Sequence, residues 1–265
     1  DALNRSGRNG TMVPALAPMI QSGCGLNFGL PLGVIAGLLG ATISIEMGLV
    51  GAWGFLMAIV ISQVFGAGFG YGYGKLLNRV KGGEMMIATY VGFSSVMIMC
   101  IAWLILPFKD PTMIWGYGGT GLRTTLSVEG FWRPILDDFL AIQLGDRFKF
   151  PTGAILVFAA LSFLIWVFFH LKIGTAITAV GSNPTYARAS GINIDRMRTV
   201  SVMMSTMLGA LGIIVFQQSF GFIQLYEGPL YMAFPAVAAI LIGGAGVNKA
   251  TLTHVFIGAA LYQGI

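Results

Sequence analysis

Charged residues divide the chain into long apolar runs. The uncharged runs cover residues 9–45, 47–74, 85–108, 150–171, 199–226, 228–248 and 250–265. Because a helix needs about 20 apolar residues to cross the core of a bilayer, the runs 47–74, 85–108, 150–171 and 199–226 each predict one membrane helix. Over the whole chain we expect about seven or eight crossings.

Two places along these runs predict interrupted helices. The run 9–45 is too long for one helix, and the glycines and proline of GLNFGLPLG (residues 25–33) mark the expected break. Near the other end, LIGGAGVNKA (residues 241–250) separates two short, glycine-rich runs. The pattern therefore predicts an all-α, polytopic transmembrane helical bundle with interrupted helices and two pseudo-repeats, in a single transmembrane domain over residues 1–265.

Composition supports the membrane assignment. The chain is 56% hydrophobic and 9% charged, with a mean hydropathy of +0.81, whereas a soluble domain carries about 25% charged residues. Glycine recurs every fourth residue at Gly25, Gly29, Gly33 and Gly37, and again at Gly66, Gly70 and Gly74. Such ridges predict close backbone contact between membrane helices.

The net charge of +5 lies in the loops and does not indicate nucleic acid as a partner. The loops 75–84 and 172–198 are basic, whereas the loop 109–149 has five residues of each sign. Two spans separate the basic loops, so both are expected on the cytoplasmic side. The balanced loop then faces outward, as a plain connector or as a docking surface for a partner.

Catalytic and metal-binding motifs are missing from the sequence. It contains no GxxxxGK[ST], HExxH or GxSxG pattern. It has two histidines and two cysteines, and the cysteines do not form a CxxC pair. Glu46, Glu84 and Glu227 all stand at span ends, where an interfacial role is expected. No enzyme activity, metal or cofactor is therefore predicted for this chain itself.

Neutral polar residues inside the runs are the candidates for a solute pathway. Isolated polar residues usually hold helices together, but Asn27 stands at the predicted break. Uncharged polar groups suit an uncharged polar solute such as a sugar. The pathway prediction, built on the two breaks and these polar groups, comprises Asn27, Phe28, Gln63, Gln217, Gln218, Gly243 and Gly244. Substitution of Asn27 or Gly244 is expected to impair passage of the solute while the protein stays assembled with any partner subunits.

A polar island, AVGSNPTYARASGIN (residues 179–193), interrupts the apolar sequence. Ser182 or Asn183 can cap a helix, Pro184 suits the first helical position, and Gly191 suits a left-handed stop. Asn193 can then cap the next helix, with Asp195 favourable in its first turn. These signals predict a short, rigid cytoplasmic helix of about two turns, either a docking element or a compact loop between spans.

The same stretch resembles the coupling segment of the ribose/galactose-type permeases of ATP-binding cassette (ABC) importers, with the pattern A-x-G-x-N-x-x-x-A-x-x-S-G-I-x-V. FPAVAAILIGGAG (residues 234–246) also resembles that family. The resemblance implies that the ATPase-coupling residues are Gly181, Asn183, Pro184, Ala187, Arg188, Ser190, Gly191 and Ile192. The family's GxDLSxG is GLNFGLPLG here, with Asn27 in place of the acid, which keeps branched-chain amino acid permeases as an alternative.

What the resemblance implies is a membrane subunit of a bacterial inner-membrane importer, with an N-terminal span and a C-terminal stretch missing from this chain. Its partners would be ATPase subunits that bind the ATP, an extracytoplasmic solute-binding protein, a second permease copy or paralogue, and membrane lipid. The expected solute is small and polar, and a sugar is the first candidate. A branched-chain amino acid, nucleoside or flavin permease and a gradient-driven secondary transporter are the alternatives.

Overall fold

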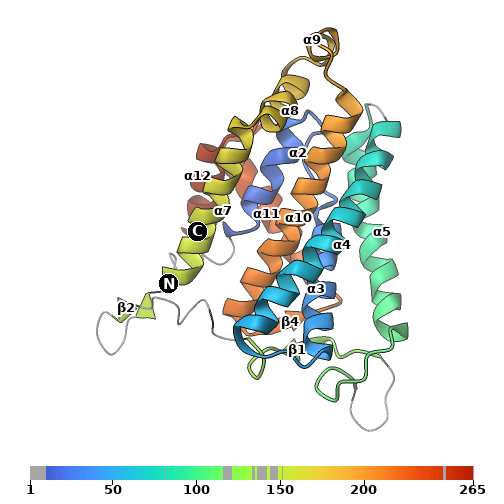
Figure 1. The fold of residues 1–265 in the computed structure, drawn as a ribbon, viewed down its shortest axis with the longest axis vertical. Coiled ribbons are helices and arrows are strands. Elements are labelled where there is room, and N and C mark those ends of the chain that lie inside the picture. Colours follow the sequence, from blue (N-terminus) through green and yellow to red (C-terminus); the bar gives the residue numbers. More distant parts are fainter. Residues whose placement is uncertain are drawn as a thin grey trace.

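The structure is a computed structural model that describes residues 10–80, 82–115, 121–132, 135, 142–143, 149–150, 152–246 and 249–264. Its helices are η1 (Val13–Leu16), α2 (Ala17–Gln21), α3 (Leu30–Glu46), α4 (Gly51–Arg79), α5 (Glu84–Ile105), α7 (Thr152–His170), α8 (Lys172–Ser182), α9 (Pro184–Ala189), α10 (Ile194–Phe220), α11 (Gly228–Ile242) and α12 (Leu252–Gly264). Its short strands are β1 (Thr125–Ser127), β2 (Ile142–Gln143), β3 (Lys149–Phe150) and β4 (Phe222–Gln224). The predicted all-α membrane bundle is confirmed (Figure 1).

The four runs expected to form single helices correspond to α4, α5, α7 and α10. Within the described residues, α4, α5 and α10 are long and apolar enough to cross a membrane, and α7 and α8 form a pair bent by 77°. Three further apolar helices are shorter, at Leu30–Glu46, Gly228–Ile242 and Leu252–Tyr262. The expected seven or eight crossings are therefore not all full-length helices, because the interrupted runs supply shorter pieces.

The prediction of a loop over residues 172–198 was wrong in its first part, because residues 172–182 form α8. The sharp bend between α7 and α8 depends on Gly174. A methyl group there would overlap the Phe168 carbonyl and would lie 2.5 Å from Phe169 Cα. Glycine thus lets the chain turn and continue as a helix instead of ending in a loop.

Both predicted interruptions are confirmed. The first lies between α2 and α3, where Gly23 and Gly25 adopt φ of +74° and +80°, a left-handed region that favours glycine. Pro31 lies in the first turn of α3, where its missing N–H costs nothing. The second lies between α11 and α12, where Gly244 has φ of +90°.

Glycine ridges bring α4 and α10 into backbone contact, as predicted. A methyl group on Gly70 would lie 2.7 Å from Met203 Cα, and one on Gly74 would lie 2.9 Å from Thr199 Cα. On the α3 side, a methyl group on Gly33 would lie 2.7 Å from the Thr206 carbonyl. Helix α10 therefore packs against glycine faces of two helices at once.

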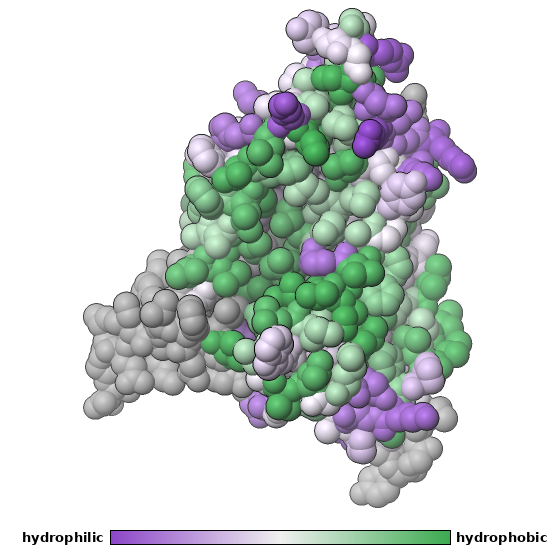
Figure 2. Space-filling view, in the orientation of Figure 1, coloured by the Kyte–Doolittle hydropathy of each residue, from purple (hydrophilic) through white to green (hydrophobic). Residues whose placement is uncertain are grey.

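The polar segments gather at the two ends of the bundle, and an apolar surface lies between them (Figure 2). At the end that carries α9, Arg198 Nη1 lies 3.3 Å from Glu84 Oε1, and Asn78 Nδ2 donates to the Asp195 carbonyl over 2.8 Å. These contacts join the loops 75–84 and 172–198 and confirm that both lie at one end. Strands β1 and β4 lie at the opposite end (Figure 1).

A small antiparallel sheet covers that opposite end. Strand β1, from the predicted outer loop, pairs with β4 so that Leu126 faces Ile223, and both side chains are buried. The Tyr226 hydroxyl donates to the Leu122 carbonyl over 3.2 Å. Burial, and secondarily the nearby Cys100 side chain, raise the pKa of Tyr226 above its usual value. The sheet anchors the outer loop to the end of α10.

Substitution of Gly70 by alanine is expected to destabilise the bundle, because the added methyl group would overlap α10. Overpacking of this kind costs about 1–3 kcal/mol, measurable as a lower thermal midpoint in detergent. Gly68→Ala and Gly72→Ala are matched controls, since nothing lies within 4 Å of a methyl group at either position. Equal stability of all three variants would contradict the backbone contact.

Candidate coupling helix and solute pathway

The short helix α9 is fixed at both ends, as the sequence predicts. At its start, Asn183 Oδ1 accepts a hydrogen bond from the Tyr186 N–H over 3.0 Å, and Pro184 occupies the first turn. At its end, Gly191 adopts φ of +79°. The Gly191 N–H donates to the Arg188 carbonyl and the Ile192 N–H to the Ala187 carbonyl, both over 3.0 Å. These two bonds form a Schellman motif, which closes a helix end.

Short connections hold α9 against its neighbours. Helix α8 ends one residue before α9 begins, with Asn183 alone between them. After α9, Asn193 Oδ1 accepts from the Arg196 N–H over 3.0 Å and caps α10, and Asp195 lies in the first turn. Helix α9 lies at the tip of the molecule in Figure 1. A displacement of α9 would therefore be passed to both α8 and α10.

The predicted coupling residues divide into an exposed set and a buried set. Exposed are Asn183, Pro184, Arg188, Ser190 and Gly191. Ala187 is fully buried, while Gly181 and Ile192 are partly buried. The prediction missed Tyr186, whose side chain is 67% exposed on α9. An exposed tyrosine in a short capped helix is the signal that could have identified it.

Asn27, from the predicted pathway, is buried in a polar network that spans four segments. Its Nδ2 donates to Ser205 Oγ on α10 over 2.7 Å, and its Oδ1 accepts from the Tyr73 hydroxyl on α4 over 3.3 Å. Ser205 Oγ in turn donates to the Ala15 carbonyl of η1 over 2.6 Å. Asn27 thus fixes the position of the first break relative to α4 and α10.

The structure does not bring the other predicted pathway residues together in one place. Gln63 Nε2 donates to the Met207 carbonyl over 3.1 Å and joins α4 to α10. Gln217 and Gln218 are buried in α10, and Gln217 Oε1 has no hydrogen-bond partner among the described residues. Phe28 contacts Phe234 of α11, with ring centroids 6.4 Å apart.

Gly243 and Gly244, the remaining two, lie at the end of α11. Gly243 is buried, and a methyl group there would overlap the His254 carbonyl of α12. Gly244 is exposed, and a methyl group there would make only an ordinary contact, 4.0 Å from His254 Cδ2. Gly243 is therefore a packing contact between α11 and α12, while Gly244 makes the turn that ends α11.

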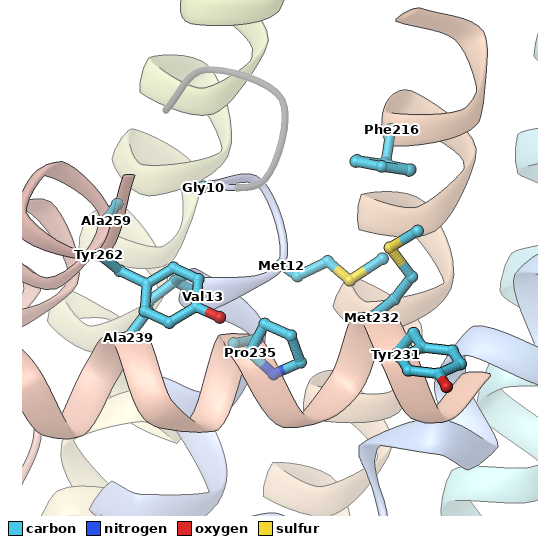
Figure 3. A pocket seen from close by; sticks show the side chains of 11 residues that line it. Gly10, Met12, Val13, Phe216, Tyr231, Met232, Pro235, Ala239, Ala259 and Tyr262 are labelled. Carbon is cyan, nitrogen blue, oxygen red and sulfur yellow. The ribbon is translucent and has the colours of Figure 1, made fainter. Parts of the chain in front are cut away.

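Two hollows flank α11 and share three residues. One is a cavity of about 230 Å³ that reaches Met12 and Phe216, and the other is a groove of about 620 Å³ that reaches Glu227 and Phe234. Tyr231, Pro235 and Tyr262 line both. In Figure 3, Pro235 lies on α11 between Tyr231 and Tyr262. Because proline lacks an N–H, Pro235 leaves the Tyr231 carbonyl without its helical donor.

The interrupted spans, the apolar surface and the capped polar helix define a multi-pass membrane protein of the permease type. The chain belongs to the family described as the branched-chain amino acid transport system / permease component, whose model matches residues 15–265.

Several proteins of known name are similar to this chain. The ribose import permease protein of Escherichia coli is 22% identical over 248 residues, which cover 92% of this chain and 68% of that protein. The xylose/arabinose import permease protein of Sulfolobus acidocaldarius is 31% identical over 111 residues, which cover 41% of this chain and 31% of that protein. The guanosine ABC transporter permease protein of Bacillus subtilis is 33% identical over 85 residues, which cover 32% of this chain and 27% of that protein. The matched part is thus less than a third of the last two proteins, and no solved structure matches the chain.

Replacement of Asn183 by alanine is expected to loosen the first turn of α9, because the Tyr186 N–H loses its acceptor. Loss of an N-cap costs about 1 kcal/mol, or about a fivefold increase in amide exchange of Tyr186 measured by hydrogen–deuterium exchange. Asn193→Ala is the matched control, since it removes the same cap from α10. Unchanged exchange at Tyr186 would show that the cap does not hold α9.

Proposed function

We propose that this chain is the transmembrane subunit of an ABC importer and forms the translocation pathway for a small polar solute. The observation that carries the proposal is α9, a rigid polar helix presented at one end of an apolar bundle. Family membership supports it, as do the printed names of the relatives, which are import permeases and an ABC transporter permease. The sequence contains no Walker A motif, so ATP would be bound by a separate partner subunit.

The proposed arrangement follows from the two polar ends. The α9 end carries the basic loops and would face the cytoplasm of a bacterial inner membrane, where ATPase subunits would grip α9. The end covered by β1 and β4 would face an extracytoplasmic solute-binding protein. A second copy or paralogue of this chain would complete the pathway, and membrane lipid would cover the remaining apolar surface.

For the solute we propose a sugar, and specifically a pentose or a compound that contains one. Xylose, arabinose and ribose are pentoses, and guanosine carries ribose; all four appear in the names of the relatives. One residue departs from the ribose/galactose-type pattern: Asn27 at the first break is neutral where that pattern has an acid, and this departure bears on the choice of solute. The family's description keeps branched-chain amino acids as the alternative, and uptake competition between ribose, guanosine and leucine separates the two.

We propose that the solute passes beside α11. The groove there combines the rings of Tyr231, Phe234 and Tyr262 with the Glu227 carboxylate. Aromatic faces suit the apolar face of a sugar ring, and the Tyr231 carbonyl, which lacks the helical N–H donor that Pro235 cannot supply, suits its hydroxyls. Phe28 contacts the groove residue Phe234, and Gly244 would act through the turn that ends α11. Buried Asn27, Gln217 and Gln218 would act by positioning helices around the groove.

Tyr186→Ala and Arg188→Glu are expected to release or uncouple the ATPase, because both side chains are exposed on α9. The measurement is co-purification of the ATPase with this chain, followed by ATP-driven uptake in proteoliposomes. A loss of about tenfold or more is expected for an anchor residue at an interface. Tyr71→Ala, an exposed tyrosine on α4, is the control. Normal ATPase binding by both α9 variants would rule out the coupling role.

Gly244→Ala is expected to lower uptake while the complex stays assembled. A side chain at a φ of +90° costs about 1–2 kcal/mol, which would alter the turn that ends α11. Gly246→Ala is the matched control, because it lies two residues away, has open space and no positive φ. Equal uptake by the two variants would remove Gly244 from the pathway proposal.

A further inference from the structure

We infer that Gln21 is the positioning residue that transmits movement of the coupling helix to both interrupted segments. This inference rests on the proposed function above. Gln21 is the last residue of α2 and stands immediately before the first break. Its side-chain amide bonds to two segments that are far from it in sequence, α8 and the connection between α11 and α12.

The donor half of the amide reaches the second break. Gln21 Nε2 donates to the Ala250 carbonyl over 2.6 Å, across 229 positions of sequence. Ala250 is buried and precedes α12, in the connection that follows Gly244. The bond therefore joins the end of the first interrupted helix directly to the second interruption.

The acceptor half of the amide reaches the coupling segment. The Thr178 hydroxyl on α8 lies 3.1 Å from Gln21 Oε1 and 3.1 Å from the Gly174 carbonyl of its own helix. A hydroxyl has one proton to donate, so Thr178 can serve either Gln21 or α8. The contact can break and reform without leaving the hydroxyl unpaired, which suits a contact that changes during a transport cycle.

Backbone packing reinforces this contact. A methyl group on Gly181 would overlap the Gln21 carbonyl and would lie 3.0 Å from the Gly23 N atom. The last turn of α8 thus rests on the backbone at the start of the first break. Because only Asn183 separates α8 from α9, a push on α9 reaches Gln21 without an intervening flexible segment.

Only an amide satisfies both contacts of Gln21. The Ala250 carbonyl requires a donor and the Thr178 hydroxyl requires an acceptor. A carboxylate at position 21 would place an oxygen against the Ala250 carbonyl, and leucine would provide neither group. These two replacements keep nearly the same size, so they test the hydrogen bonds separately from the packing.

The test uses the assembled importer in proteoliposomes, with ATP hydrolysis and uptake of radiolabelled ribose and guanosine measured in parallel. For Gln21→Leu and Gln21→Glu we expect normal assembly, near-normal ATP hydrolysis and about a fivefold fall in solute transported per ATP. Thr178→Val is expected to lower the solute transported per ATP by a smaller factor. The double variant is expected to lower it no further than Gln21→Leu does, because the two residues share one contact. Thr175→Val is the matched control, since within the part of the chain that the structure describes that hydroxyl donates to the Lys172 carbonyl of its own helix.

A second measurement separates transmission from simple stabilisation. In the wild-type complex, addition of ATP should change amide exchange at residues 249–252, and Gln21→Leu should abolish that response while exchange without ATP stays the same. A fall in uptake that merely follows loss of assembled complex would overturn the inference, as would an unchanged ratio of transport to ATP hydrolysis. If wild type transports normally and the variants do too, only the role of Gln21 fails. If no ATPase associates with wild type, the proposed function fails with it.

Discussion

The close backbone contact of α10 with α3 and α4 is the constraint on which the rest of the structure depends. In lipid, helices gain little from the hydrophobic effect on association, so contact must come from close packing of small residues. Gly66, Gly70 and Gly74 of α4 lie along Met207, Met203 and Thr199 of α10. Four-residue steps on both helices keep this contact in register over more than two turns. Helix α10 is thereby a fixed axis, with α9 before its start and β4 after its end.

Interrupted helices create a second demand, because helix ends inside the apolar region leave backbone groups without partners. Hydroxyls on one face of α10 meet part of this demand. Ser205 Oγ donates to the Ala15 carbonyl over 2.6 Å, where Pro18 has no N–H to offer. Ser201 Oγ donates over 2.5 Å to the Pro18 carbonyl, which also accepts from the Ser22 N–H. Ser201 and Ser205 are both fully buried. The fixed axis therefore also supplies the polar groups that allow η1 and α2 to end within the bundle.

The sequence predicted those features that depend on local chemistry. The caps of α9 follow from Asn183, Pro184 and Gly191, and the first break follows from the glycines around Asn27, because backbone preferences act within a few residues. Helix α8 was missed, since its continuation past Leu171 depends on how Gly174 packs against the Phe168 carbonyl. The pairing of β1 with β4 was missed for the same reason, as it joins segments about a hundred residues apart.

Residues that the sequence pattern placed in one functional group differ in how deeply they are buried in the structure. Ala187 matches the coupling pattern, yet it faces the bundle, while its exposed neighbour Tyr186 went unpredicted. The side chain of Asn27 was expected beside a solute because it is polar at a break, and its contacts are instead with Ser205 and Tyr73. A polar residue in a membrane helix can bind a neighbouring helix or face a pathway, and only the tertiary contacts distinguish the two.

The same contacts bear on how a chain with so few charges could carry a polar solute. Its buried amides and hydroxyls, such as Asn27, Ser201 and Ser205, already serve as hydrogen-bond partners of backbone and side chains. A solute that required strong charge pairing would need ionisable groups inside the bundle, and such groups are costly there. A neutral solute needs only weak, replaceable contacts, of the kind that the ring faces of Tyr231, Phe234 and Tyr262 beside α11 could provide. Weak contacts also favour release, so in the proposed importer the energy of ATP hydrolysis would be needed to change the shape of the pathway and not to extract the solute from a tight site.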